Sequence, residues 1–125
     1  MKLLLDTHIL LWVMREAEEL SGAARAMIER AEEVHVSSVS LWEVAIKRAS
    51  GKVMLDPARI RATLEGTAFL ELPVAWTHAV AVDSLPTLHH DPFDRLLVAQ
   101  ALHERLALLT HDEALAPYSP AIIVV

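Results

Sequence analysis

Short apolar strands alternate with helices along the chain, and this alternation constrains the fold more than any other feature. The first strand, residues 1–5, contains the run Leu3-Leu4-Leu5 and ends at Asp6. Consecutive apolar residues in so short a segment are typical of a strand that is buried on both faces. We expect further strands at residues 34–37, 69–72, 106–110 and 121–125, and helices at residues 7–15, 22–33, 39–49, 57–66, 74–82 and 92–104, with one helical turn at 112–116.

This order of elements predicts an α/β fold, because parallel strands must be joined by crossover helices that cover the sheet. We therefore expect a three-layer α/β/α sandwich with a central parallel sheet. The length of 125 residues and the absence of a linker predict a single domain over residues 1–125. Helix starts are marked by Ser21 and by the pairs Asp56-Pro57 and Asp91-Pro92, in which Asp caps the helix and Pro takes its first position.

Composition excludes several classes of protein. A hydrophobic fraction of 54% excludes a disordered chain, and the absence of cysteine excludes disulfide frameworks and thiolate metal sites. No signal peptide or membrane span is present in the pattern, so we expect a cytoplasmic protein without a membrane partner. The apolar content is high for this length, which favours a homodimer or another protein partner.

Net charge bears on nucleic acids as partners. The chain has 17 acidic and 11 basic residues, for a formal net charge of −6. This excess disfavours binding to nucleic acid by bulk electrostatics, which requires a basic surface. It leaves open an enzyme that approaches a phosphodiester through metal ions.

Acidic residues follow the strands that should meet at one edge of the sheet. Asp6 follows the first strand and Asp112 follows the fourth, while Glu43, Asp91 and Asp94 lie near the starts of two helices. In parallel sheets, ligands bind beyond the carboxyl ends of the strands. Carboxylates gathered there repel one another, and a hard divalent cation such as Mg²⁺ or Mn²⁺ would relieve the repulsion. Such a centre suits phosphodiester hydrolysis.

Each acid also has a simpler structural interpretation. Asp6 could cap a helix, and Asp91 and Asp94 could be a cap and a first-turn acid. Ser40 and Glu43 fit a capping box, as do Thr110 and Glu113. Glu43 and Lys47 are spaced as an ordinary ion pair within one helix.

Four segments together resemble the PIN-domain family, and within it the VapC-type toxins of type II toxin–antitoxin pairs. They are LLDTHILLW at residues 4–12, SSVSLWEVAIK at 37–47, HDPFDRLLVAQA at 90–101 and LTHD at 109–112. The order and spacing of the segments match along essentially the whole chain. The resemblance implies a PIN-like fold, metal-dependent endoribonuclease activity on RNA, and regulation by a cognate antitoxin.

The resemblance also implies roles for particular residues. The acidic quartet falls on Asp6, Glu43, Asp94 and Asp112. Asp6 and Asp94 would hold the principal Mg²⁺ or Mn²⁺, while Glu43 and Asp112 would complete its shell through water or hold a second ion. Asp91 would be a supporting or additional ligand. The hydroxyl groups that orient the carboxylates and water would be those of Thr7 and Thr110.

Other polar residues keep open interpretations. Lys47, Arg48 and Arg95 are candidate RNA contacts, with a solvated basic surface or a salt bridge as the alternative. The absence of helical zinc spacing makes the histidines poor zinc ligands, and the roles of His8, His89, His90 and His111 stay open, although a surface loop near the site is expected for His89 and His90. Trp12, Trp42 and Trp76 are expected in the core or at an interface.

Two other functions compete with the ribonuclease. A catalytically silent PIN-like binding module would act through its antitoxin in transcriptional autoregulation, but the intact quartet argues against it. A phosphoryl-accepting domain would need paired acids after the first strand and a lysine at a late strand end, which this sequence lacks.

Overall fold

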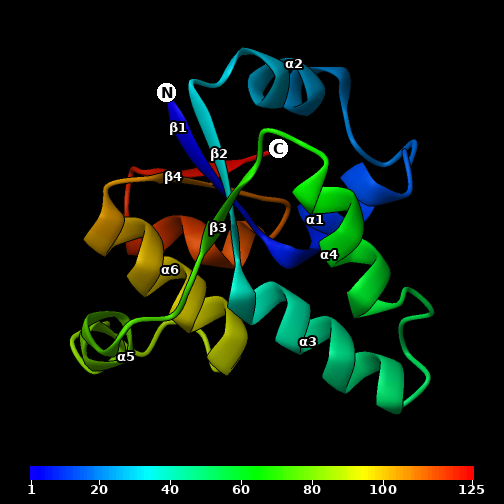
Figure 1. The fold of residues 1–125 in the computed structure, drawn as a ribbon. Helices are drawn as coiled ribbons and strands as arrows, with labels where there is room; N and C mark the ends of the chain where they lie inside the picture. The colour runs from blue at the N-terminus through cyan, green and yellow to red at the C-terminus, as the bar shows by residue number, and fades with distance from the viewer.

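The computed structural model describes all residues 1–125 and confirms the predicted three-layer fold (Figure 1). Five strands form one sheet with the order β3-β2-β1-β4-β5, and every neighbouring pair is parallel. The elements in chain order are β1 (Lys2–Leu5), α1 (Thr7–Met14), α2 (Gly22–Arg30), β2 (Glu33–Ser37), α3 (Ser38–Ala49), α4 (Pro57–Glu65), β3 (Leu70–Leu72), α5 (Trp76–Val82), α6 (Pro92–Glu104), β4 (Ala107–Thr110), the 3-10 helix η1 (Glu113–Tyr118) and β5 (Ile122–Val124).

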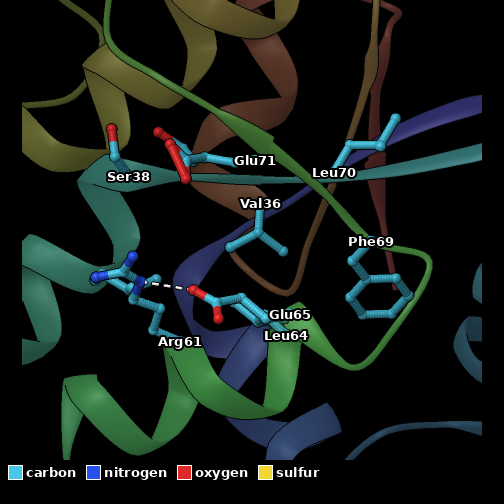
Figure 2. A pocket seen from close by; sticks show the side chains of 10 residues that line it. Val36, Ser38, Arg61, Leu64, Glu65, Phe69, Leu70 and Glu71 are labelled. Carbon is cyan, nitrogen blue, oxygen red and sulfur yellow. Dashed lines mark hydrogen bonds and ion pairs between the residues drawn. The ribbon is translucent and has the colours of Figure 1, made fainter.

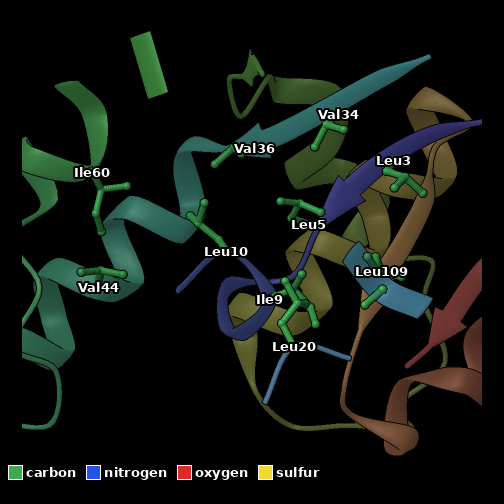
Figure 3. Packing of buried hydrophobic residues seen from close by; sticks show 11 residues of the cluster. Leu3, Leu5, Ile9, Leu10, Leu20, Val34, Val36, Val44, Ile60 and Leu109 are labelled. Carbon is green, nitrogen blue, oxygen red and sulfur yellow. The ribbon is translucent and has the colours of Figure 1, made fainter. Parts of the chain in front are cut away.

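Strand β1 lies in the middle of the sheet, and its leucines divide between two cores. Leu3 and Leu5 pack on one face with α1, α2 and α4, while Leu4 packs on the other with α6 and η1. Figure 3 shows the first of these cores, to which Ile9 and Leu10 of α1 also belong. All three leucines are fully buried, as expected for a strand covered on both faces.

Element boundaries agree with the predicted ones to within three residues, and those of α6 agree at both ends. Helix α2 ends at Arg30, three residues before the predicted end, because Ala31 is already extended. The last helical turn runs through Pro117 as a 3-10 helix to Tyr118 rather than stopping before it. The caps at Ser21, Asp56 and Asp91 are confirmed, since each side chain accepts a hydrogen bond from a backbone N–H in the first turn.

The tryptophans are expected in the core or at an interface, and the structure excludes the core for two of them. Trp42 and Trp76 are 58% and 93% exposed, which leaves an interface as the expectation for both. Trp42 packs edge-on against Phe93 at a ring distance of 5.0 Å, which leaves much of its indole in solvent.

None of the helices combines the length and the apolar character that a membrane crossing requires.

Candidate metal centre

The centre of the sheet brings together Asp6 and Thr110, two of the predicted site residues. Chain connections run from β1 to β2 on one side, and β4 then pairs with β1 on the other. This reversal of strand order is where parallel sheets open a crevice for ligands. Asp6 lies directly after β1 at this point, and its backbone N–H continues the ladder to the Leu109 carbonyl at 2.9 Å. Thr110, the last residue of β4, donates its hydroxyl hydrogen to Asp6 Oδ2 at 2.5 Å.

Asp6 is both a helix cap and a buried acid at the crevice. Its Oδ1 accepts the backbone N–H of His8 at 3.2 Å, which confirms the cap expected for α1. The residue is only 3% exposed. Burial raises the pKa of the Asp6 carboxyl, although the hydrogen bonds from Thr110 and His8 act in the opposite direction. A carboxylate kept here is therefore costly unless a cation approaches it.

Glu43 is presented by α3, and the capping box expected for it is wrong. The cap of α3 is Ser37, whose Oγ accepts the Val39 N–H at 3.1 Å. Ser40 instead lies within the helix and accepts the Thr7 hydroxyl hydrogen at 2.9 Å. Glu43 is therefore free of capping, and its buried side chain binds Lys47 Nζ through Oε2 at 2.5 Å. Its other oxygen, Oε1, is buried and has no hydrogen-bond partner.

The start of α6 separates the roles of Asp91 and Asp94. Asp91 Oδ1 accepts the N–H groups of Phe93 and Asp94 at 2.8 and 3.2 Å, so this carboxylate caps the helix. The Asp94 side chain does not cap the helix. Burial, followed by the charges of Asp6, Asp91 and Glu43, raises the pKa of Asp94 to about 7, and His89 opposes the rise. Acids that are far apart in the sequence, Asp6, Glu43 and Asp94, therefore lie close enough in space to repel one another.

Asp112 follows β4 and caps η1. Its Oδ1 accepts the Ala114 N–H at 2.9 Å, so the expected capping box of Thr110 and Glu113 is also wrong. Thr110 Oγ1 instead accepts the Asp112 N–H at 3.0 Å while donating to Asp6. One hydroxyl therefore links two acids of the predicted quartet. Thr7, predicted for a similar role, makes its hydroxyl contact with Ser40 and not with a carboxylate.

The sequence left the role of His89 open, and the structure places this residue at the acids. Its Nε2 lies 3.1 Å from Asp112 Oδ2 and 3.5 Å from Asp94 Oδ2. Asp112 is 23 residues away along the chain, so no local spacing signalled the contact. The other three open histidines lie elsewhere: His8 and His90 are exposed, and His111 Nδ1 lies 2.7 Å from the backbone carbonyl oxygen of Val125.

The predicted basic contacts are engaged within the protein. Lys47 is paired with Glu43, as the simpler interpretation expected. Burial lowers the pKa of the Lys47 ammonium, but its hydrogen bond to Glu43 and the charges of Glu43, Asp91 and Asp94 outweigh this and raise that pKa. Arg48 lies 3.5 Å from Asp56. Arg95 donates to the carbonyls of Pro86 and Val82, at 3.0 and 3.3 Å.

The residues present fit a hard divalent cation. Asp94 lies close enough to Asp6 and Glu43 to feel their charges, and one oxygen of Asp94 lies within 4.8 Å of one of Asp112. Carboxylate oxygens are the donors that Mg²⁺ and Mn²⁺ accept. The Oε1 atom of Glu43 is a buried acceptor that nothing in the protein satisfies. Burial above all, and for Asp94 also the neighbouring acids, raises the pKa values of Asp6 and Asp94, so a charged carboxylate at either position is costly unless a cation offsets it. A single ammonium, that of Lys47, offsets only part of this charge.

Two pockets differ in the residues that line them and in their position relative to the predicted site residues. One, of about 240 Å³, is bordered by Thr7, Glu43 and Lys47 and opens beside the acids. Another, of about 430 Å³, lies between α4, the start of α3, the end of β2 and the start of β3 (Figure 2). Its wall carries the ion pair of Arg61 and Glu65 at 2.7 Å, and none of the four predicted acids lines it. The second pocket therefore lies apart from the four predicted acids.

Comparison with known proteins agrees with the resemblance seen in the sequence. The family model of the PIN domain matches residues 3–119. The chain is 33% identical over 115 residues to Ribonuclease VapC22 of Mycobacterium tuberculosis (strain ATCC 25618 / H37Rv), covering 90% of this chain and 88% of that protein.

Solved structures share the fold. VapBC2 from Rickettsia felis, crystallised bound to a DNA fragment from its promoter, aligns with a TM-score of 0.71 at 15% identity, over 100% of this chain and 98% of that one. A toxin–antitoxin complex from Klebsiella pneumoniae also aligns with a TM-score of 0.71, at 21% identity over 98% and 97%. The family-model match and the VapC22 relative confirm the family that the four sequence segments indicated: this chain belongs to the PIN domain family.

Proposed function

We propose that this protein is a metal-dependent endoribonuclease and the toxin of a toxin–antitoxin pair, with residues 1–125 forming one nuclease domain. The convergence of Asp6, Glu43, Asp94 and Asp112 at the switch point of the sheet carries the proposal. The 33% identity to a protein named a ribonuclease supports the choice of RNA as substrate. The cofactor would be Mg²⁺ or Mn²⁺.

The four acids would hold the cation, with Asp6 and Asp94 as its principal ligands. A divalent cation bound there supplies an activated water and offsets the charge that develops on the phosphate. Glu43 and Asp112 would complete the shell. Asp91 has one oxygen committed to the helix cap, which suits a supporting role rather than that of a primary ligand.

The protein's own groups prepare the crevice for a cation. Thr110 holds Asp6 by its hydroxyl and fixes the backbone of Asp112, so the two acids keep a constant relation. Asp94, with a pKa near 7, retains a proton in part of the population at neutral pH. A cation would replace that proton. Lys47 neutralises one oxygen of Glu43 and leaves the other unsatisfied.

RNA contacts beyond the acids are proposed for Lys47, Arg48 and Arg95. All three side chains have partners inside the protein, and Arg95 has the most, so each would have to share or exchange those partners to bind a phosphate. Exchanging Lys47 and Arg48 together for alanine should weaken RNA binding if they touch phosphates. An RNA affinity that does not change would remove both as contacts.

We also propose a cognate antitoxin and a second copy of the chain as partners. The structural neighbours include complexes of toxins with antitoxins. Exposed apolar side chains on α3 and α5, namely Trp42, Ile46, Trp76 and Val80, support a protein interface.

One assay tests the function directly. The protein is incubated with mixed RNA and Mg²⁺ or Mn²⁺, with and without a chelator, beside the Asp6→Asn variant. Cleavage that needs the metal and is lost in the variant supports the proposal. A folded, metal-binding protein that leaves RNA intact would favour the silent binding module, and an acid-labile phosphate on the protein would favour a phosphoryl-accepting domain.

A further inference from the structure

His89 is held in place by three contacts of different kinds. Its backbone N–H donates to Tyr118 Oη at 3.0 Å, and its ring Nδ1 accepts the Asp91 N–H at 3.1 Å. The opposite ring nitrogen, Nε2, faces Asp112 Oδ2 at 3.1 Å. The side chain is 21% exposed, so the ring lies against the acids rather than in the solvent. An ordinary surface histidine has no such set of partners.

The Asp91 contact decides which ring nitrogen carries the proton. A backbone amide can only donate, so Nδ1 must be the unprotonated nitrogen, and the proton of the neutral ring is on Nε2. That N–H points at Asp112 Oδ2, with Asp94 Oδ2 at 3.5 Å. His89 is therefore a hydrogen-bond donor to the acidic crevice.

This tautomer argues against the obvious alternative, a mixed metal site. His89 Nε2 and one oxygen each of Asp94 and Asp112 lie within 4.8 Å of one another, a spacing that three ligands of one ion could have. A ring nitrogen must be unprotonated to bind a metal. If the neutral ring moved its proton from Nε2 to Nδ1, the Nδ1–H would face the Asp91 N–H. Two donors would then point at each other, and the hydrogen bond from Asp91 would be lost.

We infer that His89 is a positioning residue, which fixes the Asp112 carboxylate for the cation without ligating it. The inference rests on the proposed function, because it takes a cation at the acids as given. Asp112 is the most exposed of the four acids, and its side chain is 37% exposed. Its Oδ1 is fixed by the Ala114 N–H, and His89 fixes Oδ2, so both oxygens have a defined direction. Partners of this kind tune metal affinity.

Hydrogen bonds from Tyr118 and Arg95 hold the loop before α6, which carries His89. Tyr118 Oη accepts both the His89 N–H and Arg95 Nη1, the latter at 3.1 Å. Arg95 also ties the loop through the carbonyls of Val82 and Pro86. The guanidinium of Arg95, Tyr118 and His89 thus form one chain of hydrogen bonds that ends at Asp112.

Binding of Mg²⁺ and of Mn²⁺ alone, measured by calorimetry, separates the two roles of His89. We expect His89→Ala to lower the affinity for both ions by about 10–100-fold, as loss of a partner of a metal ligand does. His89→Gln, whose amide nitrogen replaces the Nε2 donor, should retain most of the affinity. His90→Ala is the matched control, because His90 is the adjacent exposed histidine. Thermal unfolding followed by circular dichroism verifies that each variant is folded.

Selectivity between the ions identifies a ligand. Nitrogen ligands favour transition metals over Mg²⁺, so loss of a ligating imidazole would weaken Mn²⁺ binding more than Mg²⁺ binding. A positioning residue predicts equal losses for the two ions. Unequal losses, an unchanged affinity in His89→Ala, or an equal loss in His89→Gln would each overturn the inference.

Nitrogen NMR of the histidine rings gives a second readout, without any RNA. In wild-type protein labelled at histidine, the His89 signal should show an unprotonated Nδ1 and a protonated Nε2, before and after saturation with Mg²⁺. Loss of the Nε2 proton on adding Mg²⁺ would mean ligation and would refute the positioning role. Failure of the proposed function looks different, because the protein would then bind ions with these same signatures but leave RNA uncut.

Discussion

The ionised carboxylate of Asp94 should lower the free energy of unfolding of the metal-free protein at neutral and alkaline pH. Its pKa rises from 3.8 to about 7 on folding, chiefly through burial and then through the charges of Asp6, Asp91 and Glu43. At about 1.4 kcal/mol per pKa unit, the difference corresponds to about 4 kcal/mol. The Asp94 side chain is only 16% exposed, so solvent removes little of this amount.

The sign follows from proton binding. Between pH 3.8 and about 7 the folded chain binds the Asp94 proton more tightly than the unfolded chain does. The free energy of unfolding therefore falls as the pH rises through this window, and the full loss is present above pH 7. Asp94→Asn cannot ionise, so it escapes the loss. We expect the variant to be more stable than the wild type by up to about 4 kcal/mol at pH 8 and nearly equal to it at pH 4.

Urea unfolding at pH 4 and pH 8, in the presence of a chelator, measures the difference. Thermal unfolding at pH 8 gives a second readout, in which the melting temperature of Asp94→Asn should be higher by roughly 10–15 °C. Asp83→Asn is the matched control, since it makes the same exchange at an exposed position at the end of α5. Saturating Mg²⁺ should stabilise the wild type, by about 2.7 kcal/mol at a hundred times the dissociation constant, and should stabilise Asp94→Asn much less. The reasoning is refuted if Asp94→Asn has no advantage at pH 8, or has the same advantage at pH 4.

Three further predictions concern the same crevice. Asp6→Asn should lose RNA cleavage by at least about 100-fold while its melting temperature is equal or higher, because the exchange removes a buried charge; cleavage rates and circular dichroism measure both. Lys47→Met should lower the free energy of unfolding by about 1–3 kcal/mol at pH 7, since buried Glu43 loses its only partner, and Mg²⁺ should restore part of the loss in a urea titration. Tyr118→Phe should lower the free energy of unfolding by about 1 kcal/mol and weaken Mg²⁺ binding, because His89 loses an acceptor; an unchanged calorimetric affinity would contradict this.

Local sequence signals predicted the elements well. Leu3-Leu4-Leu5 indicated a strand buried on both faces, and each of these leucines is fully buried. The Asp-Pro pairs at residues 56–57 and 91–92 marked helix starts, because an Asp oxygen reaches the first free backbone N–H groups and Pro needs none. These signals depend on neighbouring residues only, so they do not depend on the tertiary fold.

The gathering of the acids could also be predicted, because strand ends in a parallel sheet share one edge. Asp6 and Thr110 meet as the topology required. The capping boxes assigned to Ser40 and Thr110 failed for the opposite reason. Their side chains found partners in distant elements, Thr7 and Asp6, which no window of neighbouring residues contains.

The sequence by itself determined the order of strands and helices along the chain, the burial of the first strand and the edge of the sheet at which the carboxylates collect. Only the tertiary structure decided which partners those carboxylates have. The loop before α6 places His89 beside Asp112, 23 residues away along the chain, and the pairing of β4 with β1 places the Thr110 hydroxyl on Asp6. Periodicity and capping reflect backbone geometry over a few residues, whereas these contacts depend on how two cores place separate elements side by side.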